Sequence, residues 1–287
     1  MNSSGGDCTK ASSRRWDPGD VEDNILASRD AIPAGAECAG RVLRGVQALA
    51  RRPIYPNGMQ TAVIVLAAGR GERLGGKTPK AFVDLAGKTL LQRTLDNLLQ
   101  FSGFGWLQPV LSASDLSLYA ERVSSGDPRV ARPVIGGAER QDSVAAGLAA
   151  IPEEFELIAI HDAARCRVSA GDVARVVEVA ERSGAAVLAA PCRDTVKLVE
   201  DGVVTTTPRR DRCWLAQTPQ VFHRSLFAEA LAKAQAEDFQ GTDDAQLVER
   251  LGAPVQVVEG SPGNFKITVP EDLALAARLL ALEEAGP

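Results

Sequence analysis

The sequence predicts an α/β fold: a Rossmann-like, mostly parallel central sheet with flanking helices and an inserted β-hairpin arm. From Thr61 onward, short apolar runs alternate with longer segments of helical periodicity, which indicates parallel strands joined by crossover helices. Two of these runs end in residues suited to ligand binding, a glycine-rich loop after Leu66 and the carboxylate of Asp162, as expected at the carboxyl edge of such a sheet. Two β-prone runs around Asp201 and Gly202 predict the hairpin.

Composition limits the function classes. A chain of 287 residues with 45% hydrophobic residues can bury one large core, or one core plus a tail. A net charge of −5 disfavours a general nucleic-acid binder, and no apolar run reaches the length of a membrane span. Two histidines disfavour His-rich metal chemistry. The odd number of cysteines and the absence of a CxxC pair disfavour a disulfide framework or a zinc site and fit a reducing cytosol; they stand at 8, 38, 166, 192 and 213.

Residues 1–60 differ from the rest and are expected to form a poorly ordered N-terminal extension to a domain at 61–287. They are rich in Ser, Gly, Ala, Asp and Arg and lack a sustained strand pattern. The apolar central region of a signal peptide is missing, and the scattered acids are atypical of a transit peptide. We therefore expect a cytoplasmic protein, with an organelle address for the extension left open.

The segment from Thr61 to Lys80 predicts a buried strand that leads into a phosphate-binding loop. Glycines allow backbone N–H groups to surround an anion, and cations neutralise its charge. The glycines stand at 69, 71, 75 and 76, and the cations are Arg73, Lys77 and Lys80. Pro79 disfavours a Walker loop, which must open directly into a helix, and Leu74 occupies the third glycine position of a dinucleotide fingerprint. A nucleotide is the expected ligand.

Further elements follow along the chain. Thr89 and Gln92 predict a capping box at the start of a helix. A strand, a helix and a second strand are expected next, at 106–111, 115–123 and 130–135. Gly136 to Leu148 then reads as a turn followed by a helix with Arg140 and Ser143 near its start, which by itself indicates no more than a polar first helical turn.

The apolar run from Leu157 predicts a strand that stops at His161, with Asp162 at its carboxyl end. A carboxylate there could bind Mg²⁺ together with triphosphate oxygens, or it could cap the following turn. Arg165 could meet the phosphate of a second substrate. We interpret His161 as a packed, hydrogen-bonded side chain rather than a general base, because a phosphate nucleophile needs no base at neutral pH.

The remaining third of the chain predicts a hairpin, several helices and two more strands. The elements are expected at 186–190, 195–199, 203–206, 225–236, 242–251, 254–258, 264–268 and 270–284. Lys266 lies on the last of these strands between apolar neighbours, so its amine must reach a special site or the surface. Thr268 and Glu271 are expected to cap the final helix.

The pattern LAAGxGxRxGxxxPK, from Leu66 to Lys80, resembles the signature loop of nucleotidyltransferases that activate sugar and polyol phosphates. The motifs GGAERQDSV, HDAAR, RDT and AQTPQVF follow in order, so residues 61–284 resemble the 2-C-methyl-D-erythritol 4-phosphate cytidylyltransferase family. The resemblance implies the nucleotide-diphospho-sugar transferase fold and transfer of a cytidylyl group from CTP to that polyol phosphate. The products would be the CDP-linked polyol and pyrophosphate, in the non-mevalonate isoprenoid pathway.

The resemblance also implies roles for individual residues. The catalytic residues would be Arg73, Lys80, Arg210 and Lys266. The nucleotide would be bound by Ala67, Ala68, Gly69, Gly71, Gly137, Ser143 and Ala163. The second substrate would be bound by Asp162, Arg165, Thr195 and Thr218, with Asp162 also holding Mg²⁺ or another divalent cation. An arm at about 191–217 would interlock two protomers and carry Thr195 and Arg210 into the neighbouring active site. Ala138 and Cys166 depart from the family pattern.

Three other functions have to be compared with this assignment. A cytidylyltransferase that acts on ribitol 5-phosphate or another sugar phosphate would share the fold and the chemistry. A non-catalytic nucleotide-binding protein would have no need of cations directed at the α-phosphate. A nicotinamide-dependent oxidoreductase is disfavoured by the missing third glycine.

Overall fold

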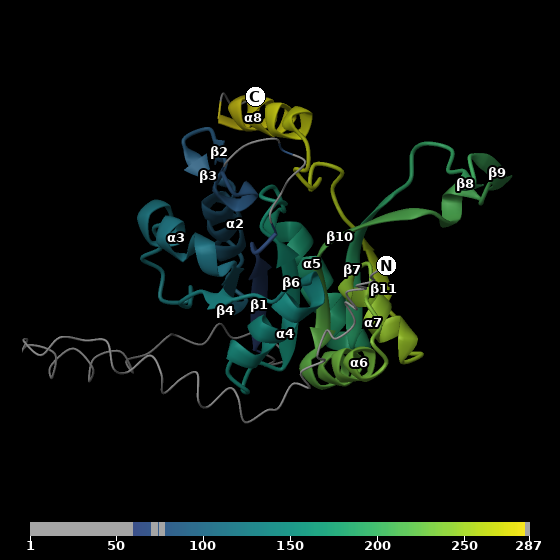
Figure 1. The fold of residues 1–287 in the computed structure, drawn as a ribbon, viewed down its shortest axis with the longest axis horizontal. Helices are drawn as coiled ribbons and strands as arrows, with labels where there is room; N and C mark the ends of the chain where they lie inside the picture. Colours follow the sequence, from purple (N-terminus) through teal and green to yellow (C-terminus); the bar gives the residue numbers. More distant parts are fainter. Residues whose placement is uncertain (1–59, 70–73, 75–77, 285–287) are drawn as a thin grey trace, which may run out of the picture. The chain divides into compact units, whose positions relative to one another are not determined.

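The protein is built around a seven-stranded sheet, seen in a computed structural model that describes residues 60–69, 74 and 78–284 (Figure 1). The strand order is β11-β7-β10-β6-β1-β4-β5, and every neighbouring pair is parallel except the two that involve β10. The predicted α/β fold with a mostly parallel sheet is therefore confirmed. The predicted poor order of residues 1–60 concerns, apart from Gln60, residues outside those described.

The strands of this sheet are β1 (Thr61–Leu66), β4 (Phe104–Leu111), β5 (Val134–Ile135), β6 (Leu157–Asp162), β7 (Ala185–Pro191), β10 (Trp214–His223) and β11 (Gln256–Glu259). Strand β1 lies between β4 and β6, and its residues from Ala62 to Val65 are fully buried. Burial on both faces explains why this strand reads as a continuous apolar run. A two-stranded ribbon, β2 (Asp84–Leu85) with β3 (Lys88–Thr89), leads into the first described helix.

Helices cover both faces of the sheet (Figure 1). Alternate residues of β1 face opposite ways, so Val63 and Val65 pack with α2 (Leu90–Leu99) and α5 (Ala170–Ser183). Ala62 and Ile64 pack instead with three helices on the other face, α4 (Arg140–Ala150), α6 (Arg224–Ala236) and α7 (Asp244–Arg250). The other two helices of the described residues are α3 (Leu116–Arg122) and α8 (Pro270–Glu284). No helix in the described part of the chain is long and apolar enough to cross a membrane.

A glycine allows helix α4 to pack directly against the sheet. A Cβ atom on Gly147 would lie 2.6 Å from Cγ2 of Ile64 and 3.0 Å from Cγ2 of Val110. Both neighbours are fully buried and cannot move aside. The close contact fixes where the first turn of α4 stands beside the end of β1.

The segment 264–268 was expected to be a strand, and this expectation is wrong. These residues form an extended segment without a place in the sheet, tied to the end of β6 by the hydrogen bond from Ile267 N to Ala164 O at 2.9 Å. The segment resembles a strand because its apolar side chains alternate with polar ones. Ile267 packs in a small separate core with Leu85 and Leu90, between the β2–β3 ribbon and α8. Lys266 therefore lies on a loop.

Other boundaries differ as well. The sequence did not predict strand β10 or helix α5. The strand expected at 130–135 is present only as β5, with an isolated β-bridge at Val130. Thr89 caps α2 by accepting from Gln92 N at 3.0 Å, but the Gln92 side chain binds Asp96, so the capping box is incomplete. At α8, Thr268 donates to Asp272 rather than to Glu271.

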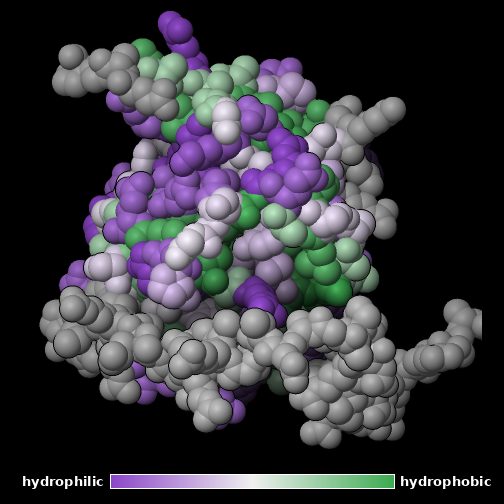
Figure 2. All heavy atoms as spheres, turned by 90° about the vertical axis from the view of Figure 1, so that its left-hand side faces the viewer, coloured by the Kyte–Doolittle hydropathy of each residue, from purple (hydrophilic) through white to green (hydrophobic). Residues whose placement is uncertain are grey.

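The predicted hairpin is present but shorter than expected, with β8 at Leu198–Glu200 and β9 at Val203–Thr206. It is joined to the sheet through β7 and β10 (Figure 1). Large apolar side chains along this arm are exposed: Leu198, Val199, Val203, Val204, Trp214 and Leu215. By contrast, the side of the molecule that carries α3 mixes hydrophilic and hydrophobic residues over its visible part (Figure 2).

Candidate active site

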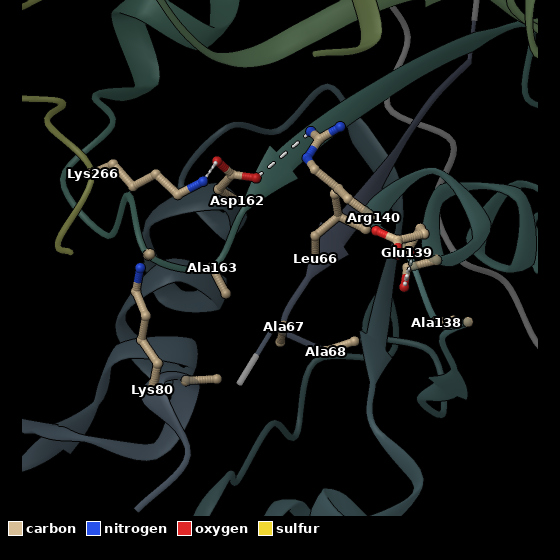
Figure 3. A pocket seen from close by; sticks show the side chains of 15 residues that line it. Leu66, Ala67, Ala68, Lys80, Ala138, Glu139, Arg140, Asp162, Ala163 and Lys266 are labelled. Atoms are coloured by element: carbon tan, nitrogen blue, oxygen red, sulfur yellow. Dashed lines mark hydrogen bonds and ion pairs between the residues drawn. The ribbon is translucent and has the colours of Figure 1, made fainter. Parts of the chain in front are cut away.

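A cavity of about 280 Å³ opens at the carboxyl ends of β1 and β6 (Figure 3). Its wall combines small residues with charged ones, which suits a ligand that has both a flat ring and an anionic group. The lining residues are Leu66, Ala67, Ala68, Gly69, Lys80, Ala81, Gly137, Ala138, Glu139, Arg140, Ser143, Asp162, Ala163, Ala164 and Lys266.

The floor of this cavity is the backbone that follows β1 and β6. Ala67 N donates to Val110 O at 2.8 Å, and Ala163 N donates to Leu66 O at 3.0 Å, so the sheet pairing continues into the cavity. The short side chains at these positions leave the space above the backbone open. Predicted nucleotide-binding residues Ala67, Ala68, Gly69 and Ala163 are thereby brought together.

Asp162 is the acidic centre of the site. Its carboxylate lies 2.8 Å from Lys266 Nζ, 3.7 Å from Arg140 Nη2 and 3.9 Å from Arg165 Nε. Burial would raise the pKa of Asp162, but the charges of Lys266, Arg140 and Arg165 hold it well below its usual range. Figure 3 shows Lys80 reaching into the same part of the cavity from the opposite side. The site therefore places the ionised carboxylate of Asp162 among several cations.

Arg140 is held in place by an acid from a distant helix. It donates two hydrogen bonds to the carboxylate of Asp244, at 2.8 and 2.6 Å, in the forked geometry that favours guanidinium–carboxylate pairs. Asp244 is buried, whereas about a third of the Arg140 side chain is exposed to the cavity. Burial alone would lower the pKa of Arg140. The negative charges of Asp244 and then Asp162 have the larger effect, so the pKa of Arg140 is raised.

Beneath Asp162, a chain of hydrogen bonds fixes the end of β6. Asp162 N donates to Thr218 Oγ1 at 3.0 Å, and the same hydroxyl lies 3.0 Å from His161 Nδ1. His161 Nε2 lies 3.1 Å from Arg165 O, so a neutral ring protonated at Nε2 satisfies every partner. Burial lowers the pKa of His161 to about 4. The interpretation of His161 as a packed residue is confirmed, and Thr218 is buried outside both cavities.

The first turn of α4 forms the opposite wall. A Cβ atom on Gly136 would lie 2.5 Å from Ser143 Oγ, so glycine allows the chain to pass directly over this hydroxyl. Ser143 is buried and donates to Glu139 O at 3.2 Å. Gly137 and Ser143 both line the cavity, as the sequence predicts for residues at a nucleotide base.

A second cavity, of about 410 Å³, adjoins the first and shares Lys266 with it. Arg165 lines it but also donates to Asn264 O at 2.8 Å and to Ala216 O at 3.2 Å, so it joins the 264–268 segment to β10. The lining residues are Arg165, Ala190, Pro191, Cys192, Arg193, Asp194, Leu215, Ala216, Gln217, Pro262, Phe265 and Lys266.

The remaining predicted residues lie elsewhere. Thr195 and Arg210 are exposed on the arm and do not line either cavity; Arg210 donates to Arg193 O at 3.1 Å. Gly71 and Arg73 lie outside the described residues. Among the residues that are described, no three His, Cys, Asp or Glu side chains gather around a common point. Asp162 could therefore hold a metal ion only together with oxygen atoms of a ligand or water.

Sequence reasoning assigned no role to three residues that organise the site. Arg140 stands in the quoted GGAERQDSV motif, which is a usable signal, and Asp244 stands in the acidic start of α7. Asn264 is completely buried and donates to Thr218 O at 2.9 Å, which anchors the loop that carries Lys266. Nothing in its local sequence distinguishes Asn264.

Comparisons with known proteins agree with this geometry. Residues 61–281 match the model of the family described as 2-C-methyl-D-erythritol 4-phosphate cytidylyltransferase. A relative with that name from Syntrophus aciditrophicus is 44% identical over 228 residues, covering 78% of this chain and 97% of the relative. One from Symbiobacterium thermophilum is 44% identical over 234 residues, covering 80% of this chain and 98% of its own.

Solved structures agree as well. The crystal structure of a protein with the same name from Thermus thermophilus is 39% identical, with a TM-score of 0.63, and the match covers 78% of this chain and 100% of that one. A 4-diphosphocytidyl-2C-methyl-D-erythritol synthase from Anaerococcus prevotii has a TM-score of 0.71 at 29% identity, covering 78% and 99% of the two chains.

Proposed function

The chain belongs to the 2-C-methyl-D-erythritol 4-phosphate cytidylyltransferase family, and we propose that it transfers the cytidylyl group of CTP to 2-C-methyl-D-erythritol 4-phosphate. The products are 4-CDP-2-C-methyl-D-erythritol and pyrophosphate. The observation that carries the proposal is the pair of adjoining cavities that share Lys266, whose amine pairs with Asp162 of the first cavity. Two substrates that must react phosphate to phosphate need such an arrangement.

We assign CTP to the first cavity. Lys80 lines this cavity and would bind the triphosphate, together with the backbone N–H groups of the glycine-rich loop and the second cation, Arg73, that the sequence predicts. The first turn of α4, with Gly137 and Ser143, is the side of the cavity suited to the cytosine edge, because it offers a buried hydroxyl close to backbone groups. Arg140 and Lys266 offer further positive charge between these two ends.

The proposed cofactor is Mg²⁺ or another divalent cation. Mg²⁺ retains several waters and binds proteins through one or two carboxylates plus substrate phosphates, so the ionised carboxylate of Asp162 fits this ion. When bound, the ion supplies charge neutralisation at the triphosphate. Asp162 would hold it, and the charges of Lys266 and then Arg140 keep that carboxylate in its ionised form.

The reaction requires little covalent chemistry from the protein. A phosphate oxygen of the acceptor forms a bond to the α-phosphorus of CTP while the bond from that phosphorus to the β-phosphate oxygen breaks and pyrophosphate leaves. Charge repulsion and misorientation oppose the attack, so correctly placed cations lower the barrier. Arg73 and Lys80 stabilise the charge that develops on the α-phosphate, and Lys266 orients the acceptor phosphate. The acceptor phosphate is already ionised, so the neutral, buried His161 is not needed as a base.

We further propose that the protein acts as a homodimer through the arm at about 191–217. The support is the exposed apolar surface of the arm, whose Val203 and Leu215 side chains are 67% and 58% exposed. Contiguous exposed apolar side chains on a hairpin are typical of an interaction surface. In such a dimer, Thr195 and Arg210 would bind the acceptor in the partner's site. We place this activity in the cytoplasm, in line with the composition.

The test is release of pyrophosphate from each of the four nucleoside triphosphates with a panel of polyol phosphates in the presence of Mg²⁺. We expect turnover with CTP and 2-C-methyl-D-erythritol 4-phosphate, and its loss on chelation of the metal. Lys266→Met should reduce turnover by orders of magnitude, whereas the same change at Lys233, exposed on helix α6 and outside both cavities, should not. Equal turnover with ribitol 5-phosphate, or none with any acceptor, would refute the assignment.

A further inference from the structure

Two cysteines face each other where the arm joins the sheet. Strands β7 and β10 are antiparallel, and Pro191 lies opposite Trp214. One step farther along the same register, Cys192 N donates to Cys213 O at 2.9 Å, so these residues form the next cross-strand pair. Only one of the two bonds of a hydrogen-bonded pair is made, because Cys213 N donates to Arg210 O. Directly opposed residues in an antiparallel ladder have side chains on the same face, with Cα atoms about 4.5 to 5.5 Å apart. That spacing is within the range for disulfides, about 4.4 to 6.8 Å.

We propose that Cys192 and Cys213 form a reversible disulfide that controls binding of the acceptor. In the single chain both thiols are free and partly exposed, so an oxidant can reach them there. The remaining described cysteine, Cys166, is buried, and burial raises its pKa to about 11, which suppresses the reactive thiolate. Among the described cysteines, Cys192 and Cys213 are therefore accessible and face each other, whereas Cys166 is buried and unreactive.

The consequence for the site follows from what each thiol touches. Cys192 lines the second cavity, which we assign to the acceptor. The thiol of Cys213 donates to Arg209 O at 3.3 Å, and Cys213 N donates to Arg210 O at 3.0 Å. Bridging turns the Cys213 sulfur away from Arg209 and toward Cys192. It therefore removes one anchor of the short helical turn Arg210–Arg212 and alters the cavity wall at the same time.

The chemistry needs an oxidant, which we take to be a low-molecular-weight disulfide such as oxidised glutathione. One cysteine thiolate attacks it, forms a mixed disulfide and releases one small thiol. The second cysteine then attacks the mixed disulfide, closes the protein bridge and releases the other small thiol. Overall, the two protein thiols lose two electrons and two protons, and the oxidant gains both. Excess dithiol reverses the reaction.

The bridge itself is tested by peptide mapping. The full-length protein is equilibrated in glutathione buffers of increasing oxidised fraction, free thiols are alkylated, and unreduced digests are analysed by mass spectrometry. We expect one cross-linked peptide pair that contains Cys192 and Cys213, with Cys166 alkylated only after denaturation, and loss of the cross-link on treatment with dithiothreitol. Separate glutathionylation of the two cysteines across the whole series, or bridges to other cysteines, would overturn the proposal.

The regulatory part rests on the proposed function and is tested by kinetics on the same samples. Oxidation should raise KM for the acceptor at least fivefold and leave KM for CTP within about twofold, and dithiothreitol should restore the original value. Cys213→Ser should show no response to oxidation. A bridged enzyme with unchanged kinetics, or a Cys213→Ser variant that still responds, would refute the control. If the reduced enzyme has no cytidylyl transfer activity, the proposed function fails, while peptide mapping still decides whether the cysteines pair.

Discussion

Replacing Asp244 by alanine tests whether the distant helix α7 supports the active site through Arg140. The substitution removes both hydrogen bonds, at 2.8 and 2.6 Å, and leaves a guanidinium without its buried partner. Breaking one side of a buried ion pair costs about 3 to 5 kcal/mol of folding free energy. Arg140 is 35% exposed and keeps Asp162 at 3.7 Å, so part of its charge is still compensated. We therefore expect a loss of about 2 to 3 kcal/mol, below the full range.

Urea unfolding followed by circular dichroism measures this loss, and for a domain of this size it corresponds to a decrease in Tm of roughly 4 to 12 °C. The matched control is Glu178→Ala, which removes an ion pair of 2.8 Å whose two side chains are 60% and 62% exposed. That change should cost no more than about 0.5 kcal/mol. An Asp244→Ala variant as stable as this control would show that the pair contributes little and would refute the reasoning.

The same variant should also bind CTP less well, because Arg140 is no longer directed into the first cavity. A rise in KM for CTP of about tenfold corresponds to about 1.4 kcal/mol of lost binding free energy. KM for the acceptor should change much less, since Arg140 does not line the second cavity. Equal increases for both substrates would point to general damage to the site rather than to a misplaced guanidinium.

Three further predictions follow from the structure. Lys80→Ala should lower kcat by 10²-fold or more with unchanged thermal unfolding, by analogy with loss of about 2.7 to 4 kcal/mol for an oxyanion donor. Lys88→Ala, at an exposed residue outside both cavities, should keep near-normal turnover; retention of activity in Lys80→Ala contradicts the assigned role. Because burial lowers the pKa of His161 to about 4 from 6.5, the unfolded state binds a proton that the folded state does not between these pH values. The free energy of unfolding should thus fall by about 3 kcal/mol from this residue as pH decreases from 6.5 to 4, and His161→Asn should show a correspondingly weaker pH dependence in urea titrations; parallel curves would argue against a neutral His161. Gly147→Ala places a Cβ atom 2.6 Å from Ile64 and should destabilise the protein by about 1 to 2 kcal/mol, overpacking outweighing the gain in helix propensity; a more stable variant in thermal unfolding would show that α4 can move away from the sheet.

The sequence predicted the parts of the fold that have strong local patterns. Strands β1 and β6 are buried on both faces and therefore read as uninterrupted apolar runs. Strand β10 escaped detection because Gln217, Thr218 and Gln220 interrupt its pattern, although all three are buried. Their polar groups are satisfied by partners far along the chain; for example, Ala245 N donates to the Gln220 side chain at 2.8 Å. A single sequence does not contain that information.

The candidate site was predictable to a similar degree. Asp162 and Lys266 stand out locally, the first at the end of an apolar strand and the second within an apolar run, and the structure brings them to 2.8 Å. The pairing of Arg140 with Asp244 joins residues that are 104 positions apart. Charge alone cannot identify such a partner, because the chain contains 37 acidic residues. Placement on neighbouring helices of one face is what selects Asp244.

The antiparallel strand β10 also has a consequence for how the chain is completed during synthesis. Strands β6 and β7 follow each other in sequence, but β10 lies between them in the sheet. When a growing chain has only reached the end of β7, the block of β5, β4, β1 and β6 can already pair, whereas β7 still lacks both of its neighbours, β10 and β11. We expect a released, truncated chain that ends near residue 195 to protect the amides of β1 from hydrogen exchange while those of β7 exchange freely. The order of the strands thus sets a late step in folding, because the middle of the sheet can close only after β10 (Trp214–His223) has been made.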